Sequence, residues 1–118
     1  MKFVTIETEA EKAVQVRLVG DSGLKSIGRL EVSYGGVWGT VCNNSFDQHD
    51  ADVVCQQLGF QYANSYGTSY GSGSGPIWLS NVQCNGDESS IAVCRHDGWG
   101  IHNCKHSQDV GITCHDGT

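Results

Sequence analysis

The sequence predicts a small α+β domain in which an antiparallel β-sheet is accompanied by one α-helix. Three observations predict this class: apolar and polar residues alternate in three stretches of the first third, apolar residues recur at helical spacing in one stretch, and 6 cysteines occur in 118 residues. A chain of this length fits one domain. No apolar stretch approaches the roughly 20 residues that span a bilayer, so we expect no direct membrane insertion.

Three strands are expected in the first third of the chain. Residues 14–19 alternate apolar and polar side chains, and the Gly-Asp-Ser-Gly run at 20–23 supplies a turn. Residues 29–34 alternate again, and Gly35-Gly36 predicts a tight hairpin into a strand over 37–42. Strands that follow one another through short turns favour antiparallel pairing.

One helix is expected between residues 47 and 59. Four apolar residues fall at i, i+3, i+4 and i+7 and therefore share one face: Ala51, Val54, Cys55 and Leu58. Asp47 is the expected N-cap, and Asp50 lies near the positive end of the helix dipole. Gly59 fits the left-handed position that ends a helix.

The second half of the chain carries weaker patterns. Residues 64–75 are Gly, Ser, Tyr, Thr and Asn without periodicity, which predicts a mobile surface loop. This loop does not resemble a phosphate-binding loop, because no Gly-Lys-Ser/Thr follows it. Residues 76–79 predict a short strand, residues 87–91 a capped single helical turn, and residues 110–114 a closing strand.

The 6 cysteines predict structural disulfides. An even count in a short chain permits a complete set, although spacing alone leaves the connectivity open. No two cysteines have the C-x-x-C spacing that a zinc or redox site would need. Disulfides persist in oxidising compartments, so we expect an extracellular location, either secreted or in the ectodomain of a membrane receptor.

The charge and the two ends of the chain give further expectations. The 13 Asp and Glu residues outnumber the 7 Lys and Arg residues, and a net charge of −6 disfavours nucleic-acid binding. Residues 1–13 contain no apolar core of signal-peptide length, so we expect an arm, tag or linker there. Either an export signal was removed, or the module was cut from a longer secreted chain. The single domain is expected over 14–115, followed by a tail over 116–118.

A series of short motifs runs in order from about Val16 to Cys114. They are Val16-Arg17-Leu18-Val19-Gly20, Gly28-Arg29-Leu30-Glu31-Val32, Trp38-Gly39-Thr40-Val41-Cys42, Asp50-Ala51-Asp52-Val53-Val54-Cys55, Leu58-Gly59-Phe60, Gly73-Ser74-Gly75-Pro76-Ile77-Trp78-Leu79, Glu88-Ser89-Ser90, Trp99-Gly100, His102-Asn103-Cys104 and Asp109-Val110-Gly111. Together these motifs resemble a scavenger receptor cysteine-rich (SRCR) domain. The extra cysteine pair of the family's eight-cysteine group would fall near Ser26 and at Phe60, so the chain resembles the six-cysteine group.

The resemblance implies a fold, a disulfide pairing and a cation site. The fold is a curved antiparallel sheet cradling one helix, and the pairs are Cys42–Cys104, Cys55–Cys114 and Cys84–Cys94. The positions that match the family's acidic cation ligands are Asn43, Asn44, Ser80 and Glu88. Only Glu88 has a carboxylate, although Asp47 and Asp87 lie close in sequence and could compensate. Calcium is therefore the candidate cation, and no cofactor is expected to be required.

The chain also carries candidate ligand-binding and modification residues. Asn43-Asn44-Ser45 is an N-glycosylation sequon at the implied cation site. Tyr66 and Tyr70 lie in a Gly/Ser-rich context typical of adaptable binding loops. Arg29 is a candidate for contacts with anionic ligands, although the bases are scattered along the chain. The tryptophans Trp38, Trp78 and Trp99 are expected mainly in the core.

The sequence gives no indication of catalysis. There is no Gly-x-Ser-x-Gly motif, and cysteines committed to disulfides cannot act as nucleophiles. The histidines near Cys104, which are His96, His102 and His106, lack metal-ligand spacing and are expected on the surface.

We therefore expect a non-catalytic extracellular recognition module of scavenger or innate-immune type that binds proteins or microbial surface molecules. The alternative is an accessory, substrate-positioning domain of a larger secreted enzyme, such as a serine protease or a lysyl-oxidase-like protein. A third interpretation is a self-associating structural module. Membership of a larger or multivalent chain fits each of these.

Overall fold

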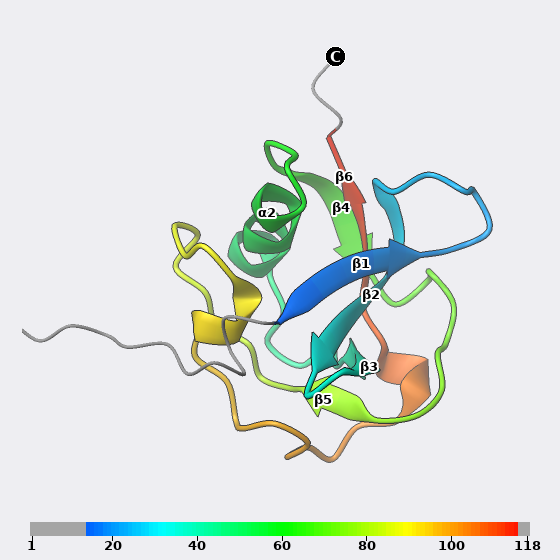
Figure 1. The fold of residues 1–118 in the computed structure, drawn as a ribbon, viewed down its shortest axis with the longest axis vertical. Helices are drawn as coiled ribbons and strands as arrows, with labels where there is room; N and C mark the ends of the chain where they lie inside the picture. Colours follow the sequence, from blue (N-terminus) through cyan, green and yellow to red (C-terminus); the bar gives the residue numbers. More distant parts are fainter. Residues whose placement is uncertain (1–13, 116–118) are drawn as a thin grey trace, which may run out of the picture.

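The computed structural model describes residues 14–115 as a curled six-stranded sheet with one helix packed against it (Figure 1). The strands are β1 (Gln15–Val19), β2 (Ile27–Tyr34), β3 (Val37–Val41), β4 (Ala63–Gly67), β5 (Ile77–Leu79) and β6 (Gly111–Cys114). The helix is α2 (Gln48–Gln57), and two single 3-10 turns are η1 (Ile91–Val93) and η2 (His106–Gln108). The expected arm at 1–13 and tail at 116–118 lie outside the described residues. This is the α+β class expected from the sequence.

Long strand β2 organises the sheet. The order is β4-β6-β2-β3-β5, and β1 also pairs with β2. Because Glu31 pairs with both Arg17 of β1 and Thr40 of β3, β1 lies along the opposite edge of β2 from β3. All pairs are antiparallel except β3 with β5, which are parallel. The sequence did not predict this parallel pair, because it depends on how the connection through α2 returns the chain to the sheet.

The β2–β3 hairpin is confirmed. Tyr34 pairs with Val37 across a two-residue turn in which Gly35 has φ 59° and Gly36 has φ 81°. Two successive positive φ values are what the tight hairpin turn requires, and glycine adopts them without a steric penalty. The adjacent Gly-Gly therefore fixes the register of both strands.

The predicted helix and both of its ends are also confirmed. Asp47 accepts a hydrogen bond from the Asp50 backbone N–H at 3.2 Å, and the Asp50 carboxylate accepts one from the Asp47 N–H at 2.7 Å, which forms a reciprocal capping box. Gly59, with φ 94°, follows the last turn in the left-handed region. The apolar face of α2 is buried at Ala51, Val54 and Cys55, with Leu58 packed at the margin of the core.

The expected mobile loop over 64–75 is partly wrong. Residues 64–67 belong to strand β4, which pairs with β6 through Tyr66–Ile112 and Gly67–Gly111. Ser, Asn and Gly have low strand propensity, but pairing with a buried neighbouring strand overrides it. The remaining residues, 68–75, are irregular in conformation and are bound to the sheet at Tyr70 and Gly73, as described below.

Three disulfides join the elements in the pairing that the resemblance implied. Cys55–Cys114 ties α2 to β6, Cys42–Cys104 ties the end of β3 to the segment before η2, and Cys84–Cys94 closes the loop that contains η1. The core between sheet and helix includes Leu30, Val32, Val41, Val53, Leu79 and Ile112, all fully buried. Within residues 14–115, no helix is long and apolar enough to cross a membrane.

The three tryptophans lie at the margin of this core. All are partly buried, and Trp78 and Trp99 pack against it. Tyr34 stacks on Trp99 with ring centroids 4.0 Å apart and meets Trp78 edge-on at 5.5 Å. The expected core position is therefore met only in part, because Trp78 and Trp99 pack at the margin of the core and none of the three tryptophans is fully buried.

Candidate functional site

The structure brings three of the four implied cation positions to one place. Asn43 and Asn44 follow β3, Ser80 follows β5, and the parallel pairing of these strands puts their ends side by side. The Asn44 side-chain nitrogen lies 3.6 Å from the Cys104 sulfur, and the Ser80 hydroxyl lies 3.5 Å from the same sulfur. Ser80 is only 2% exposed, whereas both asparagines are exposed.

Glu88 is committed to a different contact. Its carboxylate accepts hydrogen bonds from the backbone N–H of Asn85, at 2.8 and 3.0 Å, and from that of Gly86 at 2.9 Å. Partial burial opposes ionisation, but these backbone hydrogen bonds outweigh it and hold the pKa of Glu88 below its ordinary value. The Glu88 carboxylate therefore stabilises the turn over residues 85–88 through hydrogen bonds to its backbone.

The residues present do not fit the calcium site that the resemblance implies. Calcium prefers several oxygen ligands, and its affinity follows the number of charged ones. Among residues 14–115, the only group of three His, Cys, Asp or Glu ligand atoms within 4.8 Å is that of Cys84, Glu88 and Cys94. Both sulfurs are in a disulfide and cannot bind a metal. Of the two proposed compensating residues, Asp47 caps α2 with one carboxylate oxygen, and Asp87 is exposed in the turn before η1.

Arg29 belongs to an ion-pair network on the sheet. Glu31 is 8% exposed and receives Arg17 on one carboxylate oxygen, at 2.7 and 3.0 Å, and Arg29 on the other, at 3.0 and 3.1 Å. The Arg17 guanidinium also lies 4.0 Å from the centre of a Trp38 ring, within cation–π range. Because the Glu31 carboxylate pairs with both arginines, it partly neutralises their charge and weakens their attraction for an anionic ligand.

Tyr66 and Tyr70 lie in different environments. The Tyr70 hydroxyl is hydrogen-bonded to Thr113 at 2.7 Å and to Ser65 at 3.0 Å, and its ring covers Gly111 so closely that no Cβ would fit there. Tyr66 is 37% exposed and meets the buried Phe46 edge-on at 6.0 Å. Tyr66 is therefore the more accessible of the two candidate ligand contacts.

A second network joins η2 to the irregular segment 68–75. Asp109 is 1% exposed, and one carboxylate oxygen accepts hydrogen bonds from the Gly73 N–H at 2.8 Å and the His106 Nδ1 at 2.9 Å. The His106 Nε2 lies 3.0 Å from the Gly75 carbonyl. Both ring nitrogens face acceptors, so only the protonated imidazole can donate to both. The hydrogen bond to Asp109 accordingly raises the pKa of His106, against the opposing effect of burial.

This network predicts a fall in stability as the pH rises. The folded state has the higher His106 pKa, so its contribution is fully present below the unfolded pKa and is lost as pH rises through the folded pKa. We expect the melting temperature, measured by circular dichroism, to fall as the pH rises above the ordinary pKa of histidine, about 6.5. Burial raises the pKa of Asp50 to about 6, so its own titration lies below this window. If the melting temperature of His106→Gln fell with pH as steeply as that of the wild-type protein, His106 would not be the group responsible.

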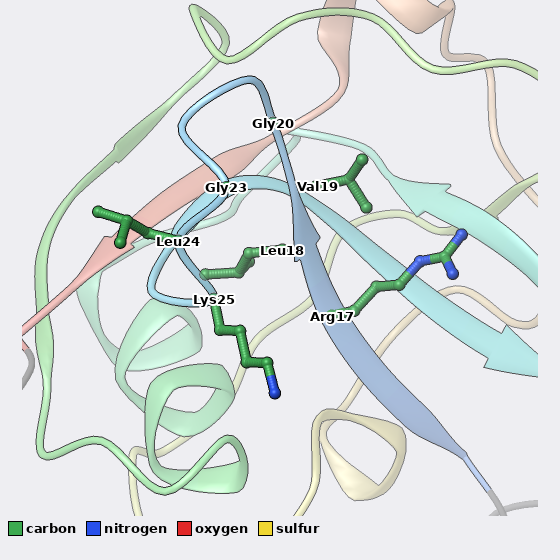
Figure 2. Close-up of a pocket in the computed structure, with 7 residues that line it drawn as sticks. All are labelled: Arg17, Leu18, Val19, Gly20, Gly23, Leu24 and Lys25. Carbon is green, nitrogen blue, oxygen red and sulfur yellow. The ribbon is translucent and has the colours of Figure 1, made fainter.

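A groove that sequence reasoning did not identify follows the edge of β1 and is lined by both apolar and basic side chains. One hollow of about 390 Å³ is lined by Arg17 to Gly20 and by Gly23 to Lys25 of the β1–β2 loop. Leu18 points toward the side of α2, where the Lys25 side chain also lies, whereas Arg17 and Val19 point to the other side of the strand (Figure 2). Two adjoining hollows continue along β1 to Leu58. The sequence signal that could have indicated this groove is Leu24, an apolar residue in an otherwise polar loop. In the structure it is 57% exposed.

Comparison with known proteins agrees with the fold. The family model for the scavenger receptor cysteine-rich domain matches residues 20–115. The SRCR domain of mouse MARCO, solved in a dimeric form, is 44% identical with a TM-score of 0.73, over 82% of this chain and 94% of that chain. The third SRCR domain of murine neurotrypsin is 40% identical with a TM-score of 0.75, over 86% of this chain and 96% of that chain.

Longer relatives carry this domain as a small part of their length. Lysyl oxidase homolog 2 of Homo sapiens is 50% identical over 105 residues, which cover 87% of this chain and 14% of that protein. Lysyl oxidase homolog 2 of Xenopus laevis is 51% identical over 105 residues, which also cover 87% of this chain and 14% of that protein. Such domains are extracellular and are not themselves catalytic, even where the longer protein is an enzyme. With the family match over 20–115, the six-cysteine pairing and the curled sheet around α2, this chain belongs to the scavenger receptor cysteine-rich domain family.

Proposed function

We propose that this domain recognises protein ligands as an accessory part of a larger secreted enzyme of the lysyl oxidase type. The observation that carries the proposal is the 50% identity to lysyl oxidase homolog 2, of which the matched region forms only 14%. The catalytic chemistry would lie elsewhere in such a chain, and this domain would hold the protein substrate. No cofactor is required for that role.

The charge of the domain supports a lysine-bearing ligand. An oxidase of lysyl groups meets positively charged side chains, and an acidic surface attracts them over the range of the Debye length. The net charge of the chain is −6. The two arginines of β1 and β2 share Glu31, which partly neutralises the positive charge on that part of the sheet.

Asp47 and Asp87 form an acidic corner that could make this contact. His49 links the two segments: its Nδ1 lies 3.8 Å from the Asp47 carboxylate, and its ring lies against Gly86, next to Asp87. Both aspartates are exposed. His49 therefore lies between the start of α2, which carries Asp47, and the turn before η1, which carries Asp87.

Binding to immobilised poly-lysine would test the proposal, with acetylated poly-lysine as the uncharged comparison. We expect salt-dependent binding to the charged polymer, none to the acetylated one, and several-fold weaker binding by Asp47→Ser/Asp87→Asn, in which serine keeps the helix cap. Asp21→Asn/Asp97→Asn is the matched control, since it removes two charges elsewhere. Equal losses in both double variants would show that only net charge matters and would overturn the acidic corner.

Recognition of microbial surfaces is the second candidate function. The family takes its name from scavenger receptors, and the SRCR domain of mouse MARCO is 44% identical to this chain. Tyr66, 37% exposed, is the candidate side chain that could contact such a ligand. Binding of whole bacteria that is lost in Tyr66→Ala, without binding to poly-lysine, would favour this function over the first.

A further inference from the structure

The turn after β3 is exposed and tightly folded. The Asn43 carbonyl accepts a hydrogen bond from the Phe46 N–H at 3.0 Å, and Ser45 has φ 61° in the left-handed region. The Asn43 N–H donates to the Gln108 carbonyl at 2.8 Å, which ties the turn to η2. All three residues 43–45 are exposed, while Phe46 is buried beneath them. The sequon residues therefore stand on a supported surface turn.

The side chain of Asn43 is free within the described part of the chain. No hydrogen bond among residues 14–115 uses its carboxamide, whereas the neighbouring Asn44 amide nitrogen contacts the Cys104 sulfur at 3.6 Å. A group attached to the Asn43 Nδ2 would consequently displace no existing interaction. The Asn-Asn-Ser sequon is also the only Asn-x-Ser/Thr sequence in the 118 residues.

We infer that Asn43 carries an N-linked glycan. The family is extracellular, so its members pass through the compartment in which such glycans are attached. The donor is an oligosaccharide on a lipid diphosphate. The bond between the first sugar carbon and the diphosphate oxygen breaks, that carbon bonds to the Asn43 Nδ2, the nitrogen loses one proton, and the lipid diphosphate leaves.

The glycan would cover the surface around Tyr66. Phe46, which closes the glycosylated turn, meets the Tyr66 ring at 6.0 Å. The same turn holds Asn43 and Asn44, two of the positions that the resemblance assigns to a cation. The attached sugar therefore shields the face that carries this turn and Tyr66 from protein contacts.

Secretion of the chain from cultured eukaryotic cells, followed by intact-mass measurement before and after glycosidase treatment, tests the modification. We expect one glycan, removed by the glycosidase with conversion of Asn43 to aspartate in the peptide map. Asn43→Gln and Ser45→Ala should abolish it, while Asn44→Gln, which keeps the sequon, should retain it. Glycans are attached before folding is complete, so protein retained in the cell is measured as well. An unmodified Asn43 in wild-type protein from both pools would overturn the inference.

Chemical nitration of tyrosine tests the shielding. We expect Tyr66, 37% exposed, to be nitrated several-fold more slowly in the glycosylated protein than after glycosidase treatment. Tyr62 is 44% exposed and stacks on His115, away from the turn, so its rate should be unchanged. Equal Tyr66 rates in both samples would show that the glycan points away from this face.

Discussion

Replacing Asp50 with alanine is expected to lower the free energy of unfolding by about 3 kcal/mol. One Asp50 carboxylate oxygen accepts the Cys84 N–H at 2.6 Å and the other accepts the Asp47 N–H at 2.7 Å. The side chain is fully buried, so alanine would leave the Cys84 N–H without a partner and would break the capping box. Loss of both contacts would loosen α2 from the segment that precedes η1.

The magnitude reflects two opposing effects. Burial, with a smaller contribution from the neighbouring Asp47, raises the pKa of Asp50 to about 6, so ionisation at neutral pH costs some of the stability that the hydrogen bonds provide. Asp50→Asn keeps one acceptor oxygen without the charge and should lose about half as much as Asp50→Ala. Urea unfolding at pH 7 measures both, with exposed Asp21→Ala as the control. A loss below about 1 kcal/mol in Asp50→Ala would mean that these contacts are redundant.

Removing the Cys55–Cys114 disulfide should cost about 4 kcal/mol through the entropy of the unfolded chain. The bond spans 59 positions and holds α2 against β6. Cys84–Cys94 spans only 10 positions, and its removal should cost about 2.7 kcal/mol. Because small domains are stabilised by only about 5–15 kcal/mol, the first loss should remove a large fraction of the total stability.

Paired alanine variants separate the two disulfides. Cys55→Ala/Cys114→Ala should unfold at a clearly lower urea concentration than Cys84→Ala/Cys94→Ala, with both measured under oxidising conditions so that the remaining bonds stay closed. The reverse order would show that native packing around Cys84, beside the Asp50 contact, outweighs loop length. That outcome would also raise the importance of the 84–94 segment in holding the start of α2.

Local features of the fold could be predicted from the sequence because they depend on residues only a few positions apart. Gly35-Gly36 accepts two positive φ values, and Asp47 satisfies the free N–H groups at the start of α2. Alternation over 14–19 and 29–34 predicted the two strands that the structure places at 15–19 and 27–34, because side chains alternate between the two faces of a sheet. The pairing of the cysteines came from the family resemblance, since spacing alone allowed other connectivities.

Strand β4 and the candidate site were decided by contacts between residues far apart in the chain. Residues 63–67 have little strand propensity and become a strand because β6 pairs with them. Asn44 and Ser80 meet at Cys104 only because β3 and β5 run parallel. No local pattern encodes either result, since both depend on the path of the intervening chain.

The sequence by itself determined that this protein is a disulfide-stabilised α+β domain with one capped helix and a glycine hairpin. Only the tertiary structure decided that Glu88 closes its own turn, that Glu31 holds two arginines, and that Asp109 is buried against His106. The physical reason is that periodicity and caps act over one or two turns of chain. The environment of a charged side chain is instead set by whichever distant segments pack around it.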